Sequence, residues 1–217
     1  MIKPMIVIMI SFLFINNISA QECGPSCPIC SGSTDGSLLS IGSLLVNSIS
    51  IPGADEENAV FNTRFGIAPR FDVGLGYGVK REKAFWNARF QVIMENERRP
   101  GIILGAGSVR IGKSDQSVYL HITKSWEISE MFALRMTSGV ANLVPEYDKI
   151  YGLGGLTFSI AEKYIPFFSY DGVEFHEGFA WIPLDWLTVS ALLVESKDLA
   201  FSVGINHSFF KTVQIND

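Results

Sequence analysis

Apolar and polar residues alternate along most of the chain beyond its first forty residues. Residues 71–80, "FDVGLGYGVK", place aromatic or branched aliphatic side chains at the odd positions and Asp72, glycines and Lys80 at the even ones. Residues 199–206, "LAFSVGIN", repeat this order. Successive side chains of a strand point to opposite faces. Such segments therefore predict strands with one large apolar face and one face of small or polar residues.

About twelve such segments follow one another. They fall at residues 38–50, 58–67, 70–80, 84–94, 100–111, 116–125, 131–142, 149–160, 164–171, 174–182, 186–196 and 198–210. Each is about ten residues long, which is enough for a tilted strand to cross a bilayer. Beyond the N-terminal region we find no sustained helical pattern of apolar residues and no apolar run as long as a spanning helix. The chain is therefore predicted to be all-β.

The small faces of these segments distinguish two all-β architectures. The solvent faces of a soluble β-sandwich are polar and usually charged, whereas these faces carry mostly Gly, Ser, Ala and Asn with an occasional Arg. Small inward residues suit a narrow barrel, and outward apolar faces with aromatics near the strand ends are typical of outer-membrane barrels. We predict a closed antiparallel transmembrane β-barrel of about twelve strands, with short turns on both sides. The alternative is a soluble periplasmic β-sandwich that acts as a binding module.

The connections between the segments form two alternating sets. We expect one set on the periplasmic side, where Trp126 and Trp186 would belong to an interfacial aromatic belt. This set is 68–70, 94–100, 126–130, 161–164 and 183–186. The other set, expected outside, consists of short charged loops at 52–58, 80–83, 112–116, 144–148, 171–174 and 195–198.

The N-terminal region has the pattern of a secretory signal peptide. Lys3 precedes an apolar run from Met5 to Ile15, and small residues follow up to Ala20, which is the usual order of charge, apolar core and cleavage site. Export predicts that the protein resides in the bacterial outer membrane. The expected regions are a signal peptide (1–20), a Cys-containing flexible tail (21–37), the β-barrel (38–210) and a C-terminal extension (211–217).

All three cysteines lie in the tail, within "QECGPSCPIC". Cys23, Cys27 and Cys30 have the spacing of an iron–sulfur motif, but an exported tail enters an oxidising compartment. Three thiols cannot all pair within one chain, so we expect one disulfide and one free or intermolecular thiol. A metal clip is the other interpretation, although a zinc site normally has a fourth ligand nearby. The tail is also a candidate contact for a periplasmic partner.

The rest of the sequence offers little for catalysis or cofactor binding. His207 and Ser208 are neighbours, so in a strand they point to opposite faces and do not form a base and nucleophile. Glu174 and His176 share a face, but one such pair is a weak metal signal. Glycine-rich residues 74–78 open no helix, which a phosphate loop requires. The net charge is −5 with scattered basic residues, and we predict no enzyme activity, no cofactor and no nucleic acid partner.

The inward faces of the early strands also carry charge. Charged groups at membrane depth are costly unless they face the interior and are paired. We therefore predict that Arg64 and Arg89 lie close to Asp72 on neighbouring strands. The full predicted lumen network is Asn62, Arg64, Asp72, Asn87, Arg89, Gln91 and Arg135. It either fills the lumen and makes the barrel rigid or lines a narrow pore with a mild preference for anions.

Several longer stretches resemble small bacterial outer-membrane barrels. "PRFDVGLGYG", "YIPFFSYDGVEF" and "FAWIPLDWLTVSALLVESKDLAFSVG" are similar in style to YjbH-like exopolysaccharide-associated barrels, in which Pro/Trp turns precede strands that end in a Glu or Asp loop. The resemblance rests on no catalytic motif, and it implies an envelope location and a link to polysaccharide export. Phe209 and Phe210 are similar to the terminal aromatic that serves as a barrel assembly signal, although "KTVQIND" follows them.

These expectations describe an outer-membrane β-barrel that acts as a structural envelope component or as a narrow passive channel. Its partners would be outer-membrane lipid and the barrel assembly machinery. The sandwich alternative would instead act as a soluble binding module in the periplasm.

Overall fold

The computed structural model describes residues 38–55, 57–108, 111, 116–143 and 149–209. These residues form twelve strands in one closed antiparallel barrel. The strands are β1 (Ser43–Ser50), β2 (Ala59–Ala68), β3 (Phe71–Gly78), β4 (Lys83–Ile93), β5 (Gly101–Gly107), β6 (Ser117–Ser129), β7 (Phe132–Leu143), β8 (Ile150–Ile160), β9 (Tyr164–Tyr170), β10 (Phe175–Leu184), β11 (Leu187–Val194) and β12 (Asp198–Ser208). Within this part of the chain, no helix has the length and apolar character needed to cross a bilayer.

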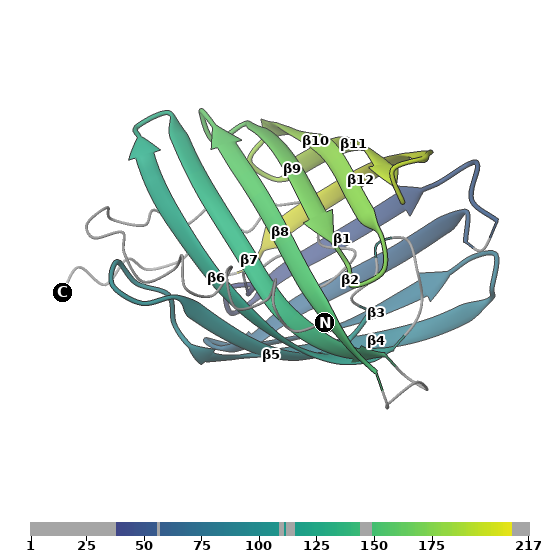
Figure 1. Ribbon diagram of the computed structural model, residues 1–217, viewed down its shortest axis with the longest axis horizontal. Coiled ribbons are helices and arrows are strands. Elements are labelled where there is room, and N and C mark those ends of the chain that lie inside the picture. The colour runs from purple at the N-terminus through teal and green to yellow at the C-terminus, as the bar shows by residue number, and fades with distance from the viewer. Residues whose placement is uncertain (1–37, 56, 109–110, 112–115, 144–148, 210–217) are drawn as a thin grey trace.

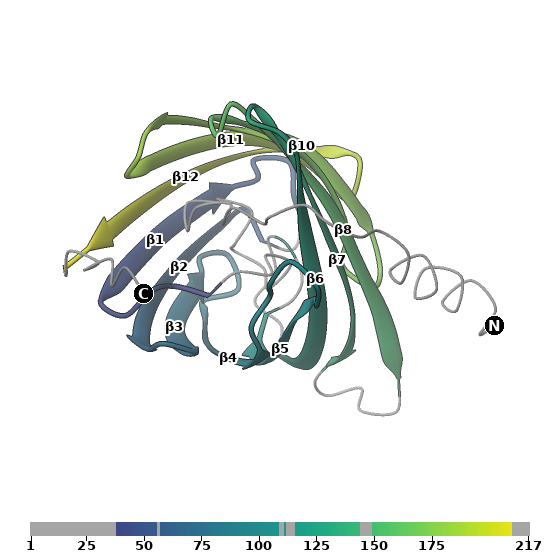
Figure 2. The same cartoon turned by 90° about the vertical axis from the view of Figure 1, so that its left-hand side faces the viewer.

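Consecutive strands are neighbours around the whole barrel, and β1 closes the ring by pairing with β12. The closing pair runs from Ser43 opposite Ser208 to Ser50 opposite Phe201. Figure 1 shows the strands of one continuous wall, and in Figure 2 the strands β1–β3 and β6–β8 form opposite sides of the barrel. The predicted closed barrel is confirmed. The sandwich alternative is wrong because the sheet returns to its own first strand instead of forming two separate layers.

The connections alternate between the two ends of the barrel, as the sequence predicts. We call the end that holds residues 38–42 the turn end; its connections are 69–70, 94–100, 130–131, 161–163 and 185–186. We call the other end the loop end; its connections are 51–58, 79–82, 108–116, 144–149, 171–174 and 195–197. Trp126 and Trp186 both lie toward the turn end. Placement of the turn end in the periplasm stays a prediction.

The expected first strand is too long at its N-terminal end. β1 begins at Ser43, because the Ser43 N–H donates to the Ser40 carbonyl oxygen at 3.0 Å and Gly42 has a φ of +71°. This bond and the positive φ at the third position are features of a type II turn, which favours glycine there. Residues 38–42 therefore fold back instead of extending the strand.

Two other boundaries differ from those expected by four residues each. β5 ends at Gly107, four residues earlier than predicted, where a φ of +142° departs from strand geometry and is accessible mainly to glycine. β6 continues to Ser129, because β7 pairs with it through residues that were expected to form a turn. The turn between β6 and β7 is accordingly reduced to residues 130–131.

The outer face of the barrel is apolar. Large hydrophobic side chains point outward and are exposed along most strands, including Phe61, Leu75, Trp86, Phe90, Phe168, Phe179, Trp181, Leu199 and Phe201. Exposing so much apolar surface to water is unfavourable, whereas a lipid environment accommodates it and the closed ring leaves no open strand edge. The outer face is thus the one that a bilayer would cover.

Glycines on the inner face are covered by rings from the next strand. A Cβ at Gly76 would lie 2.0 Å from the Phe85 ring, and a Cβ at Gly105 would lie 2.2 Å from the Tyr119 ring. Each glycine is paired directly with the residue whose ring covers it. The room that these glycines leave in the lumen is therefore occupied by aromatic side chains.

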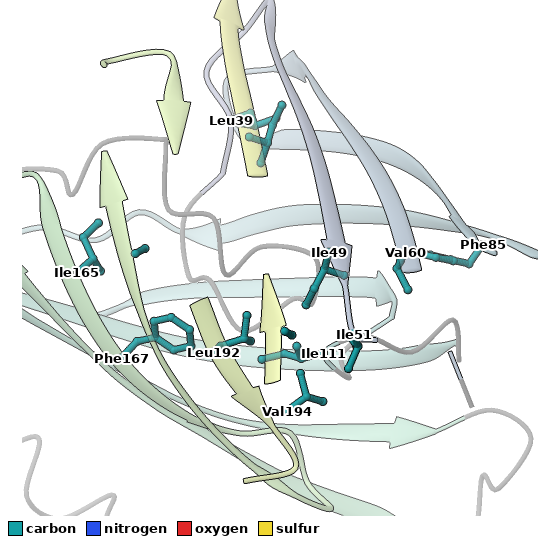
Figure 3. Close-up of a cluster of buried hydrophobic side chains, with 13 residues drawn as sticks. Leu39, Ile49, Ile51, Val60, Phe85, Ile111, Ile165, Phe167, Leu192 and Val194 are labelled. Carbon is teal, nitrogen blue, oxygen red and sulfur yellow. The ribbon is translucent and has the colours of Figure 1, made fainter. Parts of the chain in front are cut away.

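An apolar cluster fills one side of the barrel. Its buried members are Leu39, Leu45, Ile49, Ile51, Val60, Phe85, Ile111, Ile165, Phe167, Ala180, Leu192, Val194 and Ala200. Ile51 and Ile111 come from loop-end connections and turn inward. In Figure 3, Ile51, Ile111 and Val194 lie together, whereas Leu39 is set apart from them. The cluster thus lines the interior from β9 through β12 to β1, β2 and β4, with Ile51, Ile111 and Val194 at the loop end and Leu39 and Ile165 toward the turn end.

Candidate functional site in the barrel interior

The inner side chains of β1 and β2 change in character from one end of the barrel to the other. Their directly paired inner residues, taken from the loop end to the turn end, are Ile49 with Val60, Asn47 with Asn62, and Leu45 with Arg64. All of these side chains are buried. This wall therefore has an apolar layer, an amide layer and a layer that includes charge.

The charged layer is a buried ion triad on three adjacent strands. Arg64 on β2 and Arg89 on β4 both contact Asp72 on β3, with exposed fractions of 4%, 2% and 0%. Arg64 Nη2 donates to Asp72 Oδ2 at 3.0 Å, while Arg89 donates from Nε to Oδ1 at 3.1 Å and from Nη2 to Oδ2 at 2.7 Å. The two-point contact of Arg89 is the strong form of this pairing. Two guanidinium groups and one carboxylate give the triad a formal charge of +1.

The amide layer contains two side-chain pairs, one that joins β2 and β4 across β3 and one that joins the neighbouring strands β1 and β12. Asn87 Nδ2 donates to Asn62 Oδ1 at 3.1 Å, and Ser202 Oγ donates to Asn47 Oδ1 at 2.8 Å. The Asn87 side chain passes over Gly74, where a Cβ would lie 2.5 Å from Asn87 Oδ1. Buried polar groups are stable when they are hydrogen-bonded. This layer therefore occupies part of the lumen with paired amides and hydroxyls.

The wall formed by β6, β7 and β8 is only partly enclosed. Its inner residues Arg135, Tyr151 and Thr157 are half-buried, whereas other inner residues of this wall are buried, including His121, Thr137 and Leu153. Arg135 Nε donates to Ser125 Oγ at 2.9 Å, which holds the guanidinium group against the wall. An accessible cation beside hydroxyl groups is suited to contact a passing anion or a polar solute.

The connection between β4 and β5 closes the turn end of β6. The Ser125 N–H donates to Glu95 Oε1, and Lys124 Nζ donates to the carbonyl oxygens of Asn96 and Glu97 at 2.7 and 3.0 Å. β6 extends past its pairing with β5, which stops at Gly101. Residues 94–100 thus satisfy polar groups along a strand segment that would otherwise have an open edge.

His176 joins two connections at the loop end. Its Nε2 lies 3.1 Å from Asp171 Oδ2, and its Nδ1 accepts the Glu195 N–H at 3.2 Å. Burial raises the pKa of the Asp171 carboxyl, but the hydrogen bonds from His176, Glu174 N–H and Val173 N–H outweigh burial, and the pKa is lowered overall. The partner of His176 is therefore Asp171 and not Glu174, because residues 171–174 turn Asp171 back over the strand.

The structure places all seven residues of the predicted network on inner faces. Asn62, Arg64, Asp72, Asn87 and Arg89 are buried on β2–β4, Gln91 is half-buried on β4, and Arg135 lies on β7. The first five form the triad and one amide pair, whereas Arg135 contacts Ser125. Cys23, Cys27 and Cys30 lie outside the described residues. Within the described residues, no group of three or more His, Cys, Asp or Glu is placed to hold a metal ion.

Sequence reasoning missed several interior polar residues. Asn47 and Ser202 fall on small inner faces, and the alternation alone could have added them to the network. Glu57 and Glu95 had no such signal because they lie in connections. Glu57 is buried and accepts the Lys80 N–H at 2.6 Å, a contact between two loop-end connections that only the closed barrel creates.

Comparison with solved structures supports the same architecture. The chain is similar to a KdgM porin, with a TM-score of 0.52 and 11% identity over 77% of this chain and 99% of that chain. It is equally similar to a KdgM porin in complex with disordered oligogalacturonate, with a TM-score of 0.52 and 10% identity over the same shares. At this identity the likeness shows the fold alone.

No protein-family model matches the chain, and no curated protein matches it in sequence. The structural neighbours are outer-membrane barrels, and a YjbH-like relationship is not shown by them. The barrel fold and the apolar outer face together support a location in an outer membrane.

Proposed function

We propose that this protein is a narrow passive channel of the bacterial outer membrane, with its solute path along the β6–β8 wall. The proposal rests on unequal burial of the interior. Most inner side chains of the barrel are buried, whereas Arg135, Tyr151 and Thr157 on β7 and β8 remain half-buried. A path beside Arg135 and Thr157 would be polar, and the apolar cluster and the paired amides would bound it on the other side. The porin-like fold also favours a channel over an enzyme.

A mild preference for anions follows from the interior charge. Arg135 is half-buried on the accessible wall, where its guanidinium group would meet a solute. Charges act over longer distances in a narrow lumen with walls of low dielectric constant. One similar porin is described in complex with oligogalacturonate, an acidic oligosaccharide. An acidic oligosaccharide is therefore the first solute class to test, and a role in polysaccharide export is included in the proposal.

A structural envelope component is the second candidate. It is favoured by the fully buried Arg64–Asp72–Arg89 triad and by the apolar cluster, which together cross-link strands on one side of the lumen. In that role the protein would strengthen the envelope and pass no solute. The two candidates differ in one measurable property, which is ion conductance.

The deciding experiment is single-channel recording of the purified protein in planar lipid bilayers, with folding checked by its migration on gels with and without boiling. We expect small, steady conductance steps and, under a salt gradient, a reversal potential shifted toward that of chloride. Oligogalacturonate should block the current more strongly than a neutral oligosaccharide of the same length. Heat-modifiable protein that gives no steps would contradict the channel and favour the structural role.

A further inference from the structure

Residues 38–42 lie against the inside of the barrel wall at the turn end. The Gly42 N–H donates to the Gly66 carbonyl oxygen at 2.8 Å, and the Phe209 N–H donates to the Gly42 carbonyl oxygen at 2.9 Å. These bonds tie the segment to β2 on one side and to the end of β12 on the other. The turn at Ser40–Ser43 then directs Leu39 inward, where only 2% of its surface is exposed.

Gly66 provides the space in which the segment is seated. It occupies an inner position of β2, and a Cβ built there would lie 2.1 Å from the Ser40 carbonyl oxygen and 2.8 Å from the Leu39 carbonyl oxygen. Backbone atoms cannot shift as cheaply as the end of a flexible side chain. Any residue larger than glycine at position 66 must therefore push residues 39–40 away from the wall.

The buried triad holds the same segment through the backbone of Leu39. The Leu39 N–H donates to Asp72 Oδ2 at 3.1 Å, the oxygen that also accepts from Arg64 and Arg89. Asp72 is paired directly with Gly66 across β2 and β3. The seat of the segment and its charged anchor are thus neighbours on the inner wall.

We propose that residues 38–42 form an internal strap that narrows the lumen at the turn end. The Leu39 side chain sets the width of the lumen there. The strap is fixed by the Gly66 seat and by the Asp72 carboxylate. This inference rests on the proposed channel function and adds a constriction that the channel would use to limit solute size. It also gives Asp72 a second role, as the anchor of the strap as well as the partner of two arginines.

Two readouts test the strap in the full-length protein. The first is thiol protection: Leu39→Cys is made in a background in which Cys23, Cys27 and Cys30 are replaced by Ser, and the folded barrel is treated with a polar maleimide. We expect slow labelling that becomes fast when Gly66→Ala is added. The control is Gly152→Ala, because a Cβ at Gly152 meets no atom within 4 Å.

The second readout is single-channel conductance. Gly66→Ala and the milder Leu39→Ala should each at least double the conductance of the native protein, and Gly152→Ala should leave it unchanged. Fast labelling of Leu39→Cys in a folded barrel that keeps Gly66 would contradict the proposal that the strap is seated against Gly66. Native conductance in both strap variants would overturn the constriction.

The remaining outcome separates this inference from the proposed function. If no variant conducts although Gly66→Ala exposes the thiol, the channel function itself fails. The seated strap then stands as a structural feature, and its role as a constriction is rejected.

Discussion

The β1–β4 wall and the β6–β8 wall face each other across one lumen, but their inward arginines have different surroundings. On β1–β4 the polar side chains contact one another: Arg64 and Arg89 share Asp72, and Asn62 contacts Asn87. On β7 and β8 three inner residues, Arg135, Tyr151 and Thr157, stay half-buried, and Arg135 donates to the Ser125 hydroxyl. Charge on the first wall is used to join strands, whereas charge on the second remains accessible.

The difference shows that inward polar residues in a small barrel do not by themselves indicate a pore. A paired, fully buried arginine contributes to cohesion, and its field is partly cancelled by its partner. A half-buried arginine keeps contact with water and can exchange partners. The division of the interior into a filled side and an accessible side is therefore the feature to test by mutation.

Removing the Asp72 carboxylate from the filled wall should have the largest effect on the stability of the barrel. Asp72→Ala leaves two buried guanidinium groups without their shared partner, which costs about 3–5 kcal/mol. Urea unfolding in detergent micelles, followed by the shift in gel migration, measures the loss. Lys197→Ala serves as the control because this lysine is exposed and its ion pairs with Glu195 and Asp198 lie at the surface. Equal stability of the two variants would show that the triad does not hold this wall together.

The next largest effect is expected from adding one methyl group to each wall, which should destabilise the barrel only on the filled side. Gly76→Ala places a Cβ 2.0 Å from the Phe85 ring, whereas at Gly155 on β8 the nearest atom is the Phe168 carbonyl oxygen at 3.5 Å. Overpacking typically costs about 1–3 kcal/mol, so Gly76→Ala should lower the thermal midpoint and Gly155→Ala should barely change it. A larger loss at Gly155 would reverse the assignment of filled and accessible sides.

Neutralising the accessible wall should change selectivity more than stability. Arg135→Gln removes the cation but keeps a side chain that can hydrogen-bond to Ser125. We expect the reversal potential under a salt gradient to move toward zero while the unfolding midpoint in urea stays close to that of the native protein. A native reversal potential in this variant would mean that Arg135 does not face the solute path.

The smallest expected effect is on the pH dependence of stability, through Asp171 at the loop end. The folded-state pKa of Asp171 is lowered below its ordinary value of 3.8, so its contribution to stability is present above that value and is lost as the pH falls through the lowered pKa. The thermal midpoint of the native barrel should therefore decrease in this acid range. Asp171→Asn should remove this part of the decrease, and an unchanged acid profile in the variant would contradict the role of the Asp171–His176 contact.

The alternation of the sequence was sufficient to predict the strands, their number and the face that each side chain occupies. These features depend on near neighbours in the chain, because a period of two residues fixes the face directly. Residues 71–78 illustrate this, since the apolar positions point outward and Asp72 points inward as the pattern predicts. The ion triad could also be anticipated, because Arg64, Asp72 and Arg89 share inner faces of three consecutive strands.

Only the closed barrel decided how the interior is filled. Residues 38–42 continue the apolar pattern of the first strand, yet the turn at Gly42 sends Leu39 inward, where Asp72 and the backbone of β2 accept it. Ile111 and Glu57 become buried because connections distant in sequence meet at one end of the ring. Local periodicity carries no information on such meetings, since strand register and closure bring residues together across the whole length of the chain. The sequence alone thus determined the wall of this protein, and the tertiary structure decided what occupies its lumen.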